Sequence, residues 1–306
     1  MQKCWHRNLV VSYLLLLITV VLWASAFVGI RIGLHSYTPG ALALLRFIVA
    51  SFAIIPLHLK YRSSVVLTRT ERLAIFILGL LGIGVYHAAL NYGEITIAAG
   101  LASFIIGLSP IFAALLARFF LKEKLGMIGW IGIAISFVGV ALIAISEGGS
   151  AAFNLGASAV LLSALITAVY TVGQKQLLKK INAIEITSLT FWSGLLGLMI
   201  FLPQLSHEFM RASLTATMAA VYLGIFPSMI AYITWSMALE RLSVTKASSA
   251  LYAMPIVATF LGWLWLKETI ALLVFGGGCL ALVGAFIVQS GKMRAPRENS
   301  PNSCAH

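Results

Sequence analysis

Ten apolar runs, each close to twenty residues long, divide this chain and restrict the structures it can form. A helix needs about 20 residues to cross the hydrocarbon of a bilayer, because each residue adds only about 1.5 Å. We therefore predict an all-α integral membrane protein with ten transmembrane helices. The runs cover approximately 10–31, 41–59, 73–92, 97–120, 126–146, 157–178, 187–204, 214–237, 243–266 and 270–289.

The composition favours lipid over water as the solvent of the chain. Hydrophobic residues make up 60% of the sequence and charged residues 10%, whereas soluble domains carry about 25% charged residues. So little charge does not cover the surface of a soluble protein of 306 residues. The net charge of +12 comes from basic residues between the apolar runs, where membrane topology explains them. We expect membrane lipid and a small-molecule substrate as partners, and no nucleic acid.

Two stretches of the chain, 98–124 and 243–269, are related to each other. Pro110 and Pro255 lie 145 residues apart, and so do Glu123 and Glu268. Several pairs at one offset indicate an internal duplication. We predict repeats of five helices each at 10–146 and 157–289, with 1–9 as a cytoplasmic N-terminus and 291–306 as a disordered tail. The further pairs at this offset are Lys122/Lys267, Ala102/Ala247, Ser103/Ser248, Gly132/Gly277 and Gly139/Gly284.

The loops predict the orientation of the chain, because cytoplasmic loops are rich in Lys and Arg. With the N-terminus in the cytoplasm, the inner segments hold 17 of these residues and the outer segments hold only Arg31, Arg211 and Lys267. Both termini are then cytoplasmic and the protein lies in the cytoplasmic (inner) membrane. Since five is an odd number, the second repeat enters the membrane from the opposite side. Inverted repeats are typical of secondary transporters that work by alternating access.

The first apolar run has two interpretations. Lys3 and Arg7 precede it, and Ala24, Ser25 and Ala26 offer a signal-peptidase site, so it resembles a signal peptide. However, the run continues to Ile30, and its removal would leave the first repeat one helix shorter than the second. We favour a retained helix.

The sequence resembles the EamA type of the drug/metabolite transporter superfamily from about residue 12 to 290. The resemblance rests on WASAF at 23–27, Arg46-Phe47, AGLAS at 99–103 leading to Ser109-Pro110, and the later copy from Lys246 through Pro255 to Glu268. It implies ten helices in an inverted five-helix repeat and transport of a small metabolite, often the export of an amino acid or a related solute. The resemblance does not imply one particular substrate.

Polar and aromatic residues within the runs are the candidates for substrate contact. Arg46 is a charge inside the second run, where it is suited to bind a carboxylate or to reach the outer surface. His87 and Asn91 share a helix face, and Tyr232 and Ser236 stand 145 residues further on. Each residue alone is also consistent with an interhelical hydrogen bond or an aromatic belt. The predicted substrate-binding set is Trp23, Ser25, Arg46, Tyr86, His87, Asn91, Tyr170, Tyr232, Ser236, Ser248 and Tyr252, beside which Thr171 is a further candidate.

Three other features have both a structural and a functional interpretation. Pro110 and Pro255 predict kinks that serve as hinges or gates, or that are static. Lys122-Glu123 and Lys267-Glu268 suit the first turn of the following helix, although a contact that changes during transport is the alternative. Small residues at 132, 136 and 139 and at 277, 281 and 284 favour close packing within one chain over a homodimer face. Monomer and homodimer both stay open.

No cofactor, metal site or catalytic residue is predicted, and the protein is not expected to be an enzyme. The sequence contains no phosphate-binding loop, no histidine–cysteine cluster and no serine–histidine–acid set. A membrane-embedded enzyme and a channel are the rival functions. No glutamate lies clearly in mid-membrane, since Glu94 and Glu240 stand at the ends of runs. That leaves His87 as the candidate for proton coupling and facilitated exchange as the alternative.

Overall fold

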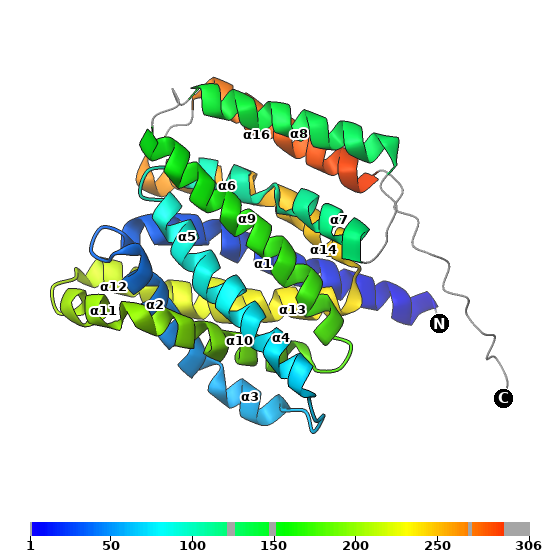
Figure 1. Ribbon diagram of the computed structural model, residues 1–306, viewed down its shortest axis with the longest axis vertical. Coiled ribbons are helices and arrows are strands. Elements are labelled where there is room, and N and C mark those ends of the chain that lie inside the picture. Colours follow the sequence, from blue (N-terminus) through cyan, green and yellow to red (C-terminus); the bar gives the residue numbers. More distant parts are fainter. Residues whose placement is uncertain (1, 121–125, 147–150, 269–270, 291–306) are drawn as a thin grey trace.

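The computed structural model describes residues 2–120, 126–146, 151–268 and 271–290, and every regular element in these ranges is a helix (Figure 1). Lys122-Glu123 and the tail at 291–306 lie outside the described residues. The elements of the first half are α1 Gln2–Gly33, α2 Pro39–Ala53, α3 Ile55–Tyr61, α4 Arg69–Gly79, the π-helix η1 Leu80–Val85, α5 Tyr86–Gly93, α6 Ala99–Ile106, α7 Ser109–Phe120 and α8 Met127–Ser146.

The second half repeats this order with more interruptions. Its elements are α9 Ala151–Leu177, α10 Ala183–Leu198, the 3₁₀ turn η2 Met199–Phe201, α11 Leu202–Phe209, α12 Leu214–Leu223, the π-helix η3 Gly224–Ile230, α13 Ala231–Arg241, α14 Val244–Ser249, the 3₁₀ turn η4 Ala250–Ala253, α15 Met254–Leu261, the π-helix η5 Gly262–Leu266 and α16 Leu272–Ser290.

Within the described ranges, seven helical segments are long and apolar enough to cross a membrane. The bent pair α2 and α3, with 41° between its members, makes an eighth if it counts as one span. Two shorter apolar helices cover Met127–Gly139 and Leu272–Ile287. The chain is thus an all-helical, multi-pass membrane protein.

The helix ends follow the sequence signals for capping. Thr68 accepts a hydrogen bond from the Glu71 amide while Glu71 bonds back, which forms a capping box at α4. The equivalent helix of the second half, α12, begins 145 residues later, and Ser213 caps it by accepting from the Ala216 amide. α4 and α12 therefore begin at equivalent places by the same chemistry.

The two prolines interrupt their helices. Pro110 is the second residue of α7, after a break between Ile106 and Ser109, and Pro255 is the second residue of α15, after the 3₁₀ turn η4. Proline is tolerated in the first helical turn, where its missing N–H would have no partner within the helix. The helix is irregular before each proline, and each segment still counts as one candidate span, Ala99–Leu116 and Lys246–Leu266.

Both halves contain a π-helix at the same place, which frees backbone carbonyls for other partners. Thr19 on α1 hydrogen-bonds the carbonyl oxygen of Ala231 at 3.4 Å, directly after η3. Ser163 on α9 donates to the carbonyl oxygen of Tyr86 at 3.1 Å, directly after η1. Tyr86 and Ala231 are 145 residues apart, so α1 meets the second half as α9 meets the first.

Helix packing shows the same relation between the two halves. α1 packs on α13 and α15, while α9 packs on α5 and α7. α2 packs on η3, whereas α10 packs on η1. The central helices bury one continuous apolar core, which α6 and α15 join from the two halves.

The pair α8 and α16 lies at one edge of the bundle (Figure 1). The Ser136 hydroxyl donates to the carbonyl oxygen of Ala281 at 2.8 Å, and a Cβ on Gly139 would lie 2.5 Å from the Ala281 nitrogen. The predicted close packing of these small residues within one chain is confirmed. The outward face of the pair exposes large apolar side chains such as Trp130, Phe137 and Phe286.

Candidate functional site

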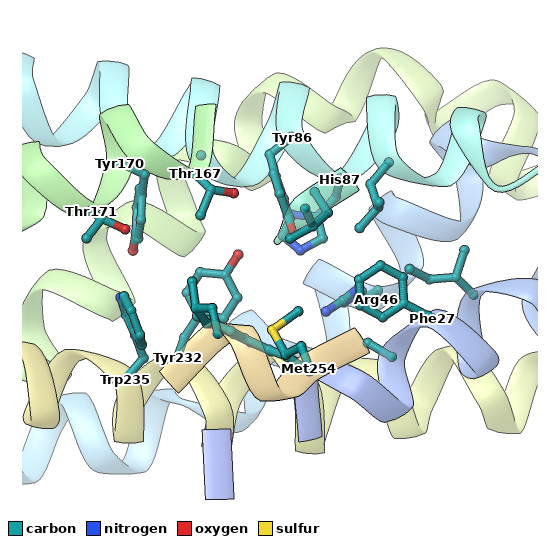
Figure 2. Close-up of a pocket in the computed structure, with 17 residues that line it drawn as sticks. Phe27, Arg46, Tyr86, His87, Thr167, Tyr170, Thr171, Tyr232, Trp235 and Met254 are labelled. Carbon is teal, nitrogen blue, oxygen red and sulfur yellow. The ribbon is translucent and has the colours of Figure 1, made fainter. Parts of the chain in front are cut away.

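A cavity lies between the two halves of the bundle, where α1, α2, α5, α9, α13 and α15 meet. Its non-atom space is about 620 Å³ when the open mouth is included. Figure 2 shows aromatic rings, one arginine and one methionine thioether around this space. The lining residues are Trp23, Ala26, Phe27, Ile30, Arg46, Gly82, Tyr86, His87, Leu90, Ile106, Thr167, Tyr170, Thr171, Tyr232, Trp235, Leu251 and Met254.

Four rings form a cluster beside the cavity in which both halves take equivalent parts. The Phe47 and His87 rings are 4.5 Å apart, and the Phe191 and Tyr232 rings are 5.4 Å apart. Phe47 also contacts Phe191 at 5.3 Å, and His87 contacts Tyr232 at 6.1 Å. The α2 and α10 helices begin 144 residues apart, which aligns the two phenylalanines, while His87 and Tyr232 are 145 apart. The halves therefore meet through equivalent residues.

Arg46 supplies the one cationic side chain among the lining residues. Its side chain comes from α2, is only 2% exposed, and donates from Nε to the Ser228 hydroxyl at 2.6 Å. Nη1 is buried and has no hydrogen-bond partner among the described residues. The guanidinium points toward the space that Tyr232 and Met254 border (Figure 2). A buried N–H group without a partner costs free energy, so this nitrogen is suited to donate to a ligand oxygen.

Aromatic groups form much of the remaining wall. The Trp23 ring contacts Tyr232 and Trp235, both at 5.3 Å between centroids. Its indole N–H donates to the carbonyl oxygen of Pro227 at 3.0 Å, within η3. Because Pro227 lies inside a π-helix, the tryptophan both fixes that irregular turn and presents its face to the cavity.

The cavity contains few groups that could perform chemistry. Among the described residues, no three His, Cys, Asp or Glu side chains lie close enough together to hold a metal ion. His87 bonds through Nδ1 to the carbonyl oxygen of Ile83 at 2.9 Å and packs against aromatic rings. The arrangement is suited to bind and release a solute through rings, hydroxyl groups and one guanidinium.

The sequence matches the model of the EamA-like transporter family twice, over residues 10–145 and 154–290. The chain belongs to the EamA-like transporter family. The two matched domains divide it into duplicated halves, and its function is transport of a small molecule rather than catalysis.

Several transporters resemble this chain along nearly its whole length. An uncharacterised transporter of Bacillus subtilis, YdfC, is 39% identical over 86% of each chain. A probable terminal-alkyne amino-acid exporter of Streptantibioticus cattleyicolor is 36% identical over 93% of this chain and 95% of its own. A probable amino-acid metabolite efflux pump of Escherichia coli is 26% identical over 89% and 93%. A crystal structure at 18% identity, with a TM-score of 0.65 over 90% of this chain and 96% of that one, shares the fold.

Six of the predicted binding residues line the cavity of the transporter and five do not. Asn91 donates to the carbonyl oxygen of Pro39 at 2.9 Å, and Ser25 bonds the Tyr222 hydroxyl at 2.7 Å. Ser236 bonds Gln174 and Thr187, and Tyr252 donates to the carbonyl oxygen of Ala285. Ser248 is buried on α14 and is not among the lining residues. The six lining residues are Trp23, Arg46, Tyr86, His87, Tyr170 and Tyr232, and the further candidate Thr171 lines it as well.

The sequence reasoning missed several lining residues. Trp235 stands three residues after Tyr232 on α13, so helical spacing alone places it on the same face. Thr167 stands one turn before Thr171 on α9 in the same way. Phe27, Leu251 and Met254 carry no polar signal, and nothing in the sequence separates them from other core residues.

The interpretation of Glu268 as a first-turn residue of the next helix is wrong. Its carboxylate accepts from the Ala99 amide at 3.0 Å, at the start of α6, and from Arg31 Nε at 3.0 Å. The next helix, α16, begins only at Leu272. Glu268 therefore ties α1 and α6 to the segment after η5, because long-range packing brings a second helix N-terminus closer than its own.

Proposed function

We propose that this transporter exports a small amphipathic carboxylate, such as an amino acid or a related metabolite, by alternating access. The observation that carries the proposal is the buried Nη1 of Arg46, which has no described partner and borders an aromatic cavity between the halves. A guanidinium binds a carboxylate through charge-assisted hydrogen bonds. Among the described residues the Arg46 guanidinium donates one hydrogen bond, from Nε to the Ser228 hydroxyl, which leaves Nη1 available to a substrate.

The walls of the cavity support an amphipathic solute. Trp23, Tyr232 and Trp235 present rings, whose faces attract an ammonium group as well as apolar surface. Leu251, Met254 and Ile106 provide an apolar side for the remaining carbon skeleton. The two relatives described as probable exporters of an amino acid or of amino-acid metabolites agree with a solute of this kind.

We propose ten spans in two inverted repeats of five. The eight long spans and the shorter apolar helices Met127–Gly139 and Leu272–Ile287 add up to that number. The exchanged contacts, Thr19 to Ala231 and Ser163 to Tyr86, support a two-fold relation between the halves. With five spans per half the axis must lie in the membrane plane, and an axis so placed can interconvert an inward-open and an outward-open state.

The orientation belongs to the same proposal. The basic residues of the loops favour both termini in the cytoplasm and the protein in the cytoplasmic membrane, with Arg31, Arg211 and Lys267 on the outer side. The helix breaks before Pro110 and Pro255 occupy equivalent places in the two halves, at the ends of α6 and η4. We assign them the role of hinges, because proline has no backbone N–H to bond across the break, so the chain bends there at lower cost than in a continuous helix.

The test is efflux from loaded proteoliposomes with three matched solutes: phenylalanine, its amide and phenethylamine, which lacks the carboxyl group. We expect phenylalanine to compete best, and Arg46→Gln to weaken it selectively. Loss of a charge-assisted hydrogen bond costs about 1.5–3 kcal/mol, which is roughly 10-fold or more in apparent affinity.

Arg46→Lys separates charge from geometry, since lysine keeps the charge and loses the planar fork. The matched control is Arg241→Gln, because Arg241 is exposed at the end of α13. Equal transport of acid and amine, or an Arg46→Gln variant that transports phenylalanine like the wild type, contradicts the assigned role of Arg46. The absence of efflux for a wider panel of amino acids contradicts the substrate class.

A further inference from the structure

Glu94 is a carboxyl group that the binding site does not use and that has no described partner. It follows Gly93 at the end of α5, and its amide still bonds the carbonyl oxygen of Leu90 at 3.0 Å. The side chain is 0% exposed, and both carboxyl oxygens are buried without a hydrogen-bond partner among the described residues. Leu90 lines the cavity, so Glu94 stands one helical turn beyond it on the same face.

Arg31 is the neighbouring cation, but it is engaged elsewhere. Its Nε donates to Glu268 Oε1 at 3.0 Å. Its Nη1 donates at 2.6 Å to the backbone carbonyl oxygen of Glu94, not to the carboxyl group. Arg31 follows Ile30, which lines the cavity. The ion pair between Arg31 and Glu268 thus joins α1 and α6 to the segment after η5. We name this end of the cavity, where Arg31, Glu94 and Glu268 lie, the Arg31 end.

The charged groups near enough to act on Glu94 are Arg31 on α1, Glu268 after η5 and Arg46 on α2. On the α9 side, Gly156 and Val160 pack against Gly93, and neither residue titrates. Burial raises the pKa of the Glu94 carboxyl well above its usual range, Glu268 acts in the same direction, and the two arginines act against them. An ionised carboxylate buried without a partner costs several kcal/mol, so this carboxyl group is neutral while the Arg31 end is closed.

Opening of the Arg31 end changes both the burial of the Glu94 carboxyl group and the pairing of Arg31. Separation of α1 from the segment after η5 breaks the pair of Arg31 with Glu268, and water then reaches the Glu94 carboxyl group. An ionised carboxylate in water, with a freed guanidinium beside it, is stable. Closure reverses these steps and requires that the carboxylate take up a proton from the solution on this side.

We propose that Glu94 is a proton-binding site of this transporter, which takes up one proton when the Arg31 end closes and releases it when that end opens. The O–H bond of the carboxyl group forms from the carboxylate and a proton of the medium, and breaks to return both. Transport therefore depends on the pH of the side to which the Arg31 end opens. This site is separate from the Arg46 site, and its test needs no transported solute.

The direct measurement is the infrared absorption of the protonated carboxyl group in purified, reconstituted protein at neutral pH. We expect a carboxylic-acid band that Glu94→Gln removes and that Glu240→Gln keeps. Glu240 is a matched control, because it stands at the end of α13, is exposed, and has a backbone carbonyl that faces Lys175 as that of Glu94 faces Arg31. An unchanged band in Glu94→Gln overturns the proposal.

Thermal unfolding excludes a merely structural role. Glutamine has the shape of a neutral glutamic acid and takes up no proton on folding, so Glu94→Gln is at least as stable as the wild type at neutral pH. As pH rises through the range where Glu94 loses its proton in the folded protein, wild-type stability falls, because the folded state binds the proton more tightly than the unfolded state. The variant lacks this decline. A Glu94→Gln variant that is destabilised at neutral pH indicates an ionised, paired carboxylate and overturns the proposal.

The conformational step is measured by maleimide labelling of Ile30→Cys in detergent, in a background where Cys4, Cys279 and Cys304 are serine. Rates are divided by those of Arg211→Cys, an exposed position, to remove the intrinsic pH dependence of thiols. We expect the normalised rate to rise at least several-fold with pH in the background that retains Glu94 and to stay flat in Glu94→Gln. Equal pH dependence in the two proteins overturns the coupling of this proton to closure.

Discussion

Replacement of Gly139 by alanine tests the packing of α8 on α16 at its closest point. A Cβ at this position would lie 2.5 Å from the Ala281 nitrogen and 2.5 Å from the carbonyl oxygen of Gly277. Both atoms belong to the backbone of α16, so no side-chain rotation relieves the clash. Ordinary contact begins at 3.4 Å, which means that the two helices must separate by roughly 1 Å.

The loss of unfolding free energy follows from that separation of the two helices. Overpacking of a close interface costs about 1–3 kcal/mol. The hydrogen bond from Ser136 to Ala281, 2.8 Å long, stretches at the same time, and interhelical bonds of this kind contribute about 0.6 kcal/mol in membranes. We therefore expect Gly139→Ala to lose about 1–3 kcal/mol of unfolding free energy, and Gly284→Ala to lose a similar amount, because its Cβ would meet Gly132 oxygen at 2.5 Å.

The control is Gly276→Ala on α16, where nothing lies within 4 Å of the added Cβ. Alanine is favoured over glycine in a helix by up to about 1 kcal/mol, so this variant keeps or gains stability. Thermal unfolding of the purified proteins, followed by tryptophan fluorescence, measures all three. If Gly139→Ala unfolds like the wild type while Gly276→Ala is destabilised, α8 and α16 do not meet through this face. Transport per folded molecule stays unchanged in Gly139→Ala, since neither helix lines the cavity.

Two further predictions concern the site and the topology. Asn91→Ala loses its hydrogen bond to Pro39 and with it about 1 kcal/mol of stability. Tyr232→Ala removes a cavity ring and weakens solute affinity several-fold. The reverse pattern of stability and affinity in the same purified variants contradicts the placement of the two residues. Cysteine labelling with a membrane-impermeable reagent at position 64, and at position 149, which lies outside the described residues, should report the inner and outer side respectively, and the opposite pattern contradicts the proposed orientation.

The apolar runs and the 145-residue offset predicted much of the fold. Run length is a direct consequence of bilayer thickness, so the long spans could be placed from hydropathy. The offset also pairs His87 with Tyr232 from the sequence alone, and their rings lie 6.1 Å apart. It did not reveal the irregular turns before Pro110 and Pro255, because a mid-run proline is compatible with a smooth kink as well as with a restart.

The same reasoning does not separate lining residues from their neighbours at the edge of a helix face. Asn91 stands four residues after His87, but the cavity face of α5 runs through Tyr86, His87 and Leu90. Asn91 lies at the border of that face, where the carbonyl oxygen of Pro39 takes its amide. Helical spacing gives a face to within about one residue, so the choice between Leu90 and Asn91 depends on which neighbour packs there.

Glu94 shows a second limit of sequence reasoning. The apolar run ends just before it, and a glutamate at such a boundary normally reaches water. Burial arises instead where α1 and α9 pack at the end of α5. Hydropathy describes a residue and its sequence neighbours, whereas this burial comes from α1 and α9, and Arg31 on α1 is 63 residues away in the chain.

The scaffold is symmetric, but the groups that face the solute are not. Alignment of α2 with α10 pairs Arg46 with Thr190, and the 145-residue offset pairs Leu90 with Trp235. The two mirrored states therefore present the solute with different groups and bind it with different free energies. Such a difference sets the affinity on each side, but it cannot produce net accumulation, because a bound state shifts an equilibrium without supplying energy to it. Export against a gradient requires a second gradient that the protein senses at a separate place. Glu94, as proposed above, binds and releases its proton only on the side of the Arg31 end, so it makes closure depend on the pH there and carries no such gradient across the membrane.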